Sequence, residues 1–166
     1  KVLILATPRT GSTYFSHMVG KLLNLNYTPE ELLIPHRTMP YLKHFHFGFE
    51  EYLRELFCVD IFVTKCMIHH YNFWLCQGTD IFEYFDLACY LTRKDERAQA
   101  KSIIKFIDNT ITEEEIGKII DWKSMEINQL TYDFLERAQH IYYFEDFIAS
   151  DKPITEFVKI INESLH

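Results

Sequence analysis

The chain has 166 residues, which is the length of one domain, so we expect a single domain over residues 1–166. A hydrophobic share of 48% and an aromatic share of 16% exclude a disordered chain. The formal net charge of −7 argues against broad binding to nucleic acid or to an anionic membrane, and we expect neither as a partner. Residues 113–166 hold 12 acids and 5 bases, whereas residues 1–112 hold 12 of each, so the first two thirds of the chain suit an anionic ligand.

The cysteines form no CxxC pair and have no spacing typical of a zinc site or a disulfide framework. We interpret them as buried thiols in a reducing compartment: Cys58, Cys66, Cys76 and Cys89. No stretch approaches the roughly 18 apolar residues of a membrane span, and the apolar start of the chain is too short for a signal peptide. The sequence therefore predicts a cytoplasmic protein.

Apolar runs of strand length alternate with stretches of helical periodicity along the chain. Strands are expected at residues 1–6, 59–65, 87–92 and 140–144. Helices are expected at residues 12–24 with Ser12 or Thr13 as the cap, 47–57, 95–107, 112–138 as one or two helices, and 153–165. The alternation predicts an α/β fold of three layers, with a central, mainly parallel sheet of about four strands flanked by helices. Ligands of such sheets bind beyond the carboxyl ends of the strands.

The segment 7–13, TPRTGST, joins the first predicted strand to the first predicted helix. Unpaired N–H groups converge at a helix start, the helix dipole favours an anion, and Gly11 allows a close approach of the backbone. Ser12 and Thr13 add hydroxyl donors, and Arg9 adds a charge-assisted pair worth about 1.5–3 kcal/mol. We therefore expect an anion site, the alternative being an ordinary capped helix start with an exposed Arg.

A second anchor is predicted after the third strand, where Arg93 stands at the strand end and Ser102 follows about two turns into the next helix. An Arg and a hydroxyl together can hold a second phosphate. The alternative is an Arg at a solvated strand end, and the first loop is what favours the functional interpretation.

These two motifs resemble those of sulfotransferases. In that family the motif P-[R/K]-[S/T]-G-[S/T]-T follows the first strand and cradles the 5′-phosphosulfate of the donor, and the matching residues here are Pro8, Arg9, Thr10, Gly11, Ser12 and Thr13. Its members bind the donor's 3′-phosphate through an Arg at a strand end and a Ser eight or nine residues on, as Arg93 and Ser102 stand here. The segments PEELL at 29–33, TKCM at 64–67 and YFEDF at 143–147 are similar to segments of the bacterial trehalose sulfotransferase type.

The resemblance implies a P-loop-like fold and a donor, 3′-phosphoadenosine 5′-phosphosulfate (PAPS), that is used without a metal. It implies Glu31 as the base that takes the acceptor proton, with Glu30 as the match if the register slips by one; either acid could instead be a helix-start residue after Pro29. Lys65 would donate to the bridging oxygen or bind the acceptor, the alternative being a solvated strand end. A histidine is a further candidate for the base: His36, His44, His46, His69 or His70. None of these has the spacing of a metal site.

The expected function is transfer of a sulfuryl group from PAPS to a hydroxyl of a carbohydrate or small-molecule acceptor. One alternative is a kinase-like P-loop phosphotransferase, which is weaker because a Walker A loop needs a second Gly and a Lys that are missing. Another is a non-catalytic nucleotide-binding relative. The chain is short for a sulfotransferase and lacks the G-x-x-G-x-x-K loop of many members, so low activity, a fragment, or a homodimer whose second subunit completes the acceptor pocket are further alternatives.

Overall fold

The computed structural model describes most of the chain: residues 1–29, 33–35, 37–40, 48–107, 110–129 and 140–164. Four parallel strands form one sheet in the order β2-β1-β3-β4: β1 (Val2–Ala6), β2 (Val63–Met67), β3 (Leu87–Thr92) and β4 (His140–Tyr143). Among the described helices are α1 (Ser12–Leu22), α3 (Phe49–Leu56), α4 (Ile68–Cys76), the 3₁₀ turn η1 (Ile81–Tyr84), α5 (Glu96–Phe106), α6 (Glu113–Gln129), α8 (Phe144–Ala149) and α9 (Lys152–Ser164). The predicted α/β fold with a parallel sheet of four strands is confirmed.

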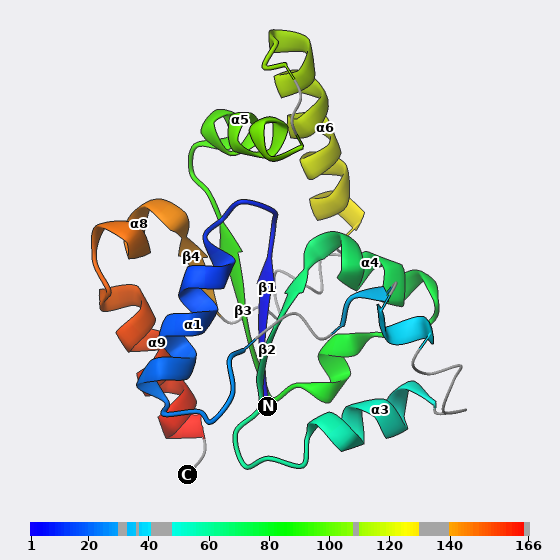
Figure 1. Ribbon diagram of the computed structural model, residues 1–166, viewed down its shortest axis with the longest axis vertical. Coiled ribbons are helices and arrows are strands. Elements are labelled where there is room, and N and C mark those ends of the chain that lie inside the picture. The colour runs from blue at the N-terminus through cyan, green and yellow to red at the C-terminus, as the bar shows by residue number, and fades with distance from the viewer. Residues whose placement is uncertain (30–32, 36, 41–47, 108–109, 130–139, 165–166) are drawn as a thin grey trace.

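The two faces of the sheet carry separate hydrophobic clusters, because successive side chains of a strand point to opposite faces. Leu3 and Leu5 of β1 pack on the side of α4 and η1, where Trp74 is buried. Ile4 packs on the opposite side against α1 and α9, whose Phe15 lies inside the cluster. Figure 1 shows these layers, with α1 and α9 on one side of the sheet and α3 and α4 on the other.

The second strand is where the sequence prediction differs most from the structure. It pairs with β1 from Val63 to Met67, so it begins four residues later than expected and ends two residues later. The predicted start at residue 59 is wrong, because Val59 continues the apolar pattern of the strand but is exposed and precedes the residues that pair with β1. Lys65 therefore lies inside the strand rather than at its end.

Several helix predictions need correction as well. The expected Ser or Thr cap of α1 is wrong, because Gly11 occupies the cap position and no side chain caps the helix. The helices α4 and α8, each beginning directly after a strand, were not predicted. The expected helix over 112–138 is described as α6 up to Gln129, and residues 130–139 lie outside the described residues. Two of the four thiols, Cys58 and Cys76, are exposed rather than buried.

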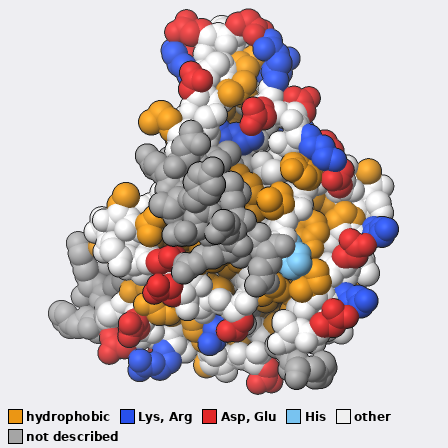
Figure 2. Space-filling model, turned by 180° about the vertical axis from the view of Figure 1, so that it is seen from behind, with side chains coloured by type: hydrophobic (Ala, Val, Ile, Leu, Met, Phe, Trp, Pro, Cys, Tyr) orange, Lys and Arg blue, Asp and Glu red, His pale blue; other side chains and the backbone are white. Residues whose placement is uncertain are grey.

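The helices α5 and α6 stand beyond the carboxyl end of the sheet, at the top of the molecule in Figure 1. They pack on each other through Ala100, Ile104 and Ile116. On the face seen in Figure 2, acidic and basic side chains alternate over this projecting part. Within the described part of the chain, no helix has the length and apolar character needed to cross a membrane.

Candidate functional site

The carboxyl ends of the strands open into a cavity of about 630 Å³, which is in the size range of small-ligand sites. Six of the predicted donor-binding residues line it: Arg9, Gly11, Ser12, Thr13, Arg93 and Ser102. The remaining lining residues come from the loop after β1, the end of β2, the start of α4, the second half of α5 with its C-cap, and the start of α8: Pro8, Met67, His69, His70, Ile103, Phe106, Ile107 and Phe144. The parallel sheet thus brings the two motifs, which are about 80 residues apart in sequence, to one site.

The loop after β1 contains two residues with left-handed backbone conformations. Arg9 and Gly11 both have positive φ, at 62° and 68°. A left-handed conformation is costly for Arg, so the surrounding contacts must hold it in place. Thr10 points inward: it is fully buried and its Oγ1 donates to the carbonyl of Thr7 at 2.8 Å. Of the predicted donor-binding residues, it is the one that does not line the cavity.

The hydroxyl of Ser12 is placed where it can contact a ligand in the cavity. It is 4% exposed, it lines the cavity, and its hydroxyl has no hydrogen-bond partner among the described residues. Because it lines the cavity and is not engaged by a described side chain, this hydroxyl can donate to a ligand oxygen there. Thr13, one residue on, is exposed and accepts a hydrogen bond at its Oγ1 from Lys65 Nζ at 2.9 Å.

Lys65 reaches the loop because its side chain stands on the α1 face of the sheet. It pairs in register with Ile4, whose side chain packs on the same face. Its ammonium group therefore lies beside Thr13, which lines the cavity, although Lys65 itself does not line the cavity and sits two positions before the end of β2.

Arg9 and Ser102 form a hydrogen bond between the loop after β1 and helix α5. Arg9 Nε donates to Ser102 Oγ at 3.1 Å, and the guanidinium carbon lies 5.2 Å from the centre of the Phe106 ring. The resemblance pairs Ser102 with Arg93 on one phosphate, whereas here Ser102 binds the Arg of the first loop. The Nη atoms of Arg9 have no hydrogen-bond partner among the described residues and remain available to an anion.

Gln99 supports the loop from α5 and was missed by the sequence analysis. Its Nε2 donates to Thr7 Oγ1 at 2.8 Å and to the carbonyl of Pro8 at 2.6 Å, and the side chain is 1% exposed. These bonds join the loop after β1 to the helix after β3. The signal in the sequence was a polar residue four positions before Ile103, on the buried face of the predicted helix.

Gly11 is fixed by its contact with α8. A Cβ atom at this position would lie 2.8 Å from a ring carbon of Phe144 and 3.2 Å from one of Phe147. We expect Gly11→Ala to lower stability by roughly 2–4 kcal/mol, because a left-handed Ala costs about 1–2 kcal/mol and the overpacking adds a similar amount. Thermal unfolding measures this, with a fall in Tm of roughly 5–10 °C.

Gly78→Ala is the matched control, because Gly78 also has a positive φ of 79° but no atom within 4 Å of the added Cβ. Its fall in Tm should reflect only the cost of a left-handed Ala, without a steric clash. An equal fall in Tm for both variants would contradict a steric role of Phe144 at Gly11.

Glu145 is the nearest acid to the second anchor and was assigned no role from the sequence. It sits in α8, and its carboxylate accepts hydrogen bonds from Arg93 Nε at 3.4 Å and from the backbone N–H of Lys94 at 3.0 Å. Partial burial pushes its pKa upward, but the bonds from the backbone N–H groups and from Arg93 outweigh burial and leave the pKa below the ordinary value of 4.5.

This pKa shift predicts how the free energy of unfolding changes at acidic pH. Because the folded-state pKa of Glu145 is depressed, its contribution is fully present above pH 4.5 and is lost as the pH falls through the lower folded value. Glu145→Gln should therefore be less stable than the wild type near pH 6 and approach it near about pH 3. Urea unfolding at a series of pH values measures the difference, and a constant difference at every pH would contradict the assignment.

Of the candidates for the base, the structure places two at the cavity, and the others fall outside the described residues. His69 and His70 line the cavity, with ring centres 4.1 Å apart. Glu30, Glu31, His36, His44 and His46 lie outside the described residues. The base therefore stays a prediction.

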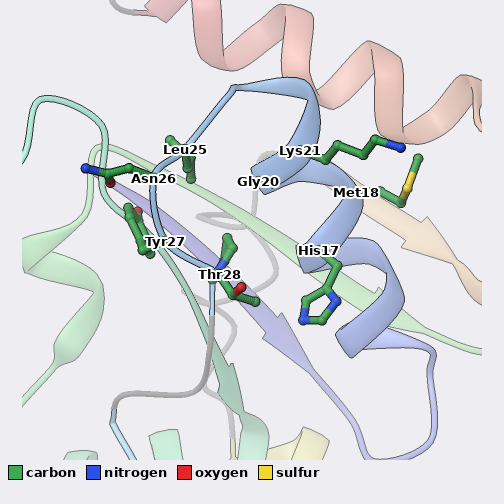
Figure 3. A pocket seen from close by; sticks show the side chains of 9 residues that line it. His17, Met18, Gly20, Lys21, Leu25, Asn26, Tyr27 and Thr28 are labelled. Atoms are coloured by element: carbon green, nitrogen blue, oxygen red, sulfur yellow. The ribbon is translucent and has the colours of Figure 1, made fainter.

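A second cavity, of about 470 Å³, lies between α1 and the segment that follows it. Figure 3 shows His17 and Lys21 extending from α1 on one side, and Tyr27 and Thr28 in the segment that faces them. Pro29, the first residue of PEELL, lines its edge. The segment that the resemblance assigns to acceptor chemistry thus begins at this cavity.

Comparisons with family models, with curated proteins and with solved structures give no match for this chain. The functional assignment therefore rests on the sequence motifs and on the geometry of the cavity that they line.

Proposed function

We propose that the chain is a sulfotransferase that moves a sulfuryl group from PAPS to a hydroxyl of a carbohydrate or small-molecule acceptor. The observation that carries the proposal is the meeting of two arginines from different strand ends at one cavity. Arg9 and Arg93 both line it, and both have Nη atoms without partners among the described residues. Two separate cationic anchors suit a ligand with two separate anionic groups, such as a nucleotide phosphorylated at both the 5′ and the 3′ position.

The size and the lining of the cavity support PAPS as the donor. Its volume of about 630 Å³ lies within the range of nucleotide-sized sites, and its apolar side chains, Ile103 and Phe106, offer contact area for a base. The 5′-phosphosulfate would lie on the loop after β1, with Arg9 and the hydroxyl of Ser12 as donors. The 3′-phosphate would bind Arg93.

The reaction would be an in-line displacement at sulfur. The acceptor oxygen forms the new bond to sulfur, the bond from sulfur to the bridging oxygen breaks, and the 5′-phosphate leaves with the electron pair. Lys65, held beside Thr13, would donate to the bridging oxygen as negative charge develops there. A base takes the proton of the acceptor hydroxyl as its oxygen bonds to sulfur, and Glu31 is the first candidate for this base.

A transfer assay tests the proposal against its two alternatives. The protein is incubated with sulfate-labelled PAPS and a panel of carbohydrates and hydroxylated metabolites, with trehalose included. We expect acceptor-dependent release of adenosine 3′,5′-bisphosphate that is insensitive to EDTA. Magnesium-dependent phosphoryl transfer from ATP would support the kinase-like alternative, and nucleotide binding without transfer to any acceptor would support the non-catalytic one.

A further inference from the structure

The acid Glu145 holds the second anchor in a defined position. Its Oε1 accepts from Arg93 Nε and from the backbone N–H of Asp95, each at 3.4 Å, and its Oε2 accepts from the backbone N–H of Lys94 at 3.0 Å. One carboxylate at the start of α8 thus binds three consecutive residues of the loop after β3. No other described acid makes a hydrogen bond to this Arg.

The orientation of the guanidinium follows from these contacts. Glu145 uses only the Nε–H of Arg93, and the guanidinium carbon lies 4.4 Å from the centre of the Phe144 ring. The side chain is only 15% exposed, so it has little freedom to turn. The two Nη atoms, which form the fork that binds phosphate in two places, have no partner among the described residues.

The same segment also touches the first anion site. The ring of Phe144 packs on Gly11 so closely that a Cβ atom there would lie 2.8 Å from it. Phe144 and Glu145 therefore stand between the loop after β1 and the loop after β3, and they fix the position of one relative to the other.

We propose that Glu145 is a positioning residue, whose carboxylate holds Arg93 so that its Nη fork is ready for the second phosphate of the ligand. This inference rests on the proposed function, because it takes the ligand to be a nucleotide with a 3′-phosphate as well as a 5′-phosphate. A carboxylate beside an Arg could instead compete with the phosphate for it. The two roles predict opposite effects on affinity.

Calorimetric titration of the full chain with adenosine 3′,5′-bisphosphate and, separately, with adenosine 5′-monophosphate distinguishes these roles. We expect Glu145→Ala to weaken binding of the bisphosphate about tenfold or more and to leave binding of the monophosphate within about twofold. Glu145→Gln should recover part of the affinity, because its amide oxygen can still accept from the loop. Asp146→Ala is the matched control, since Asp146 pairs with Lys94 Nζ at 2.6 Å, whereas the hydrogen bond and ion pair of Arg93 go to Glu145.

Each other outcome overturns the inference. Unchanged or tighter binding of the bisphosphate to Glu145→Ala would show that the carboxylate competes with the ligand. An equal loss for both nucleotides would show a general structural role rather than a specific one. Failure of the wild type to bind either nucleotide would overturn the proposed function, and the inference that rests on it would fall with it.

Discussion

Arg93→Ala is expected to weaken binding of adenosine 3′,5′-bisphosphate about 100-fold. A charge-assisted hydrogen bond contributes roughly 1.5–3 kcal/mol, and a bidentate Arg–phosphate contact lies at the upper end of that range. Arg93 lines the cavity, and its Nη atoms have no hydrogen-bond partner among the described residues. A phosphate can therefore bind at these atoms without displacing an existing hydrogen bond. Adenosine 5′-monophosphate, which lacks the 3′-phosphate, should bind the variant and the wild type nearly equally. Calorimetry with the two nucleotides measures both values.

Arg97→Ala is the control for this experiment. Arg97 stands one turn further on, is exposed, and pairs with Glu113 rather than facing the cavity. Its removal should leave both affinities unchanged. A loss of bisphosphate affinity in Arg97→Ala equal to that in Arg93→Ala would mean that net charge, and not the placement of Arg93, governs binding.

Lys65→Met is expected to slow sulfuryl transfer by about 10²–10³-fold while the affinity for adenosine 3′,5′-bisphosphate changes only a few-fold. Removal of one donor to an oxygen that gains charge in the transition state has an effect of this size. Lys65 lies beside the loop through its 2.9 Å bond to Thr13, where the bridging oxygen of the donor would sit. Met keeps the length of the side chain and removes the charge. The turnover number and the nucleotide affinity are measured separately.

Lys101→Met serves as the comparison, because Lys101 is exposed on α5 and, unlike Lys65, makes no hydrogen bond to a described residue that lines the cavity. It should transfer at the wild-type rate. If Lys65→Met lost nucleotide affinity to the same extent as turnover, Lys65 would be a binding residue and not a group that acts in the chemical step.

The fold was predictable because its strands are short apolar runs followed by strong local signals. The run Val2–Ala6 is fully buried on both faces of the sheet, and such runs are typical of parallel strands. The helix α4 was not predicted, because it begins at Ile68 with no turn or cap residue after β2. The start of β2 was misplaced, because Val59 and Ile61 continue the apolar pattern outside the pairing with β1.

The site was predictable in part, for a topological reason. Arg9 and Arg93 each follow a strand, and β1 and β3 are neighbours in the sheet, so both residues reach the same edge. The contacts that hold them were not predictable, because Gln99 and Glu145 act through the packing of α5 and α8 on those loops. Partners of this kind depend on where two helices meet in space, and neither side chain has a recognisable motif.

Calorimetric titration of the wild-type protein with adenosine 3′,5′-bisphosphate shows whether the cavity binds a nucleotide with two phosphate groups. We expect one binding site per chain, an affinity that EDTA does not change, and tighter binding of this ligand than of ATP with magnesium. Absence of binding at millimolar bisphosphate, or binding of ATP only when magnesium is present, would contradict this expectation.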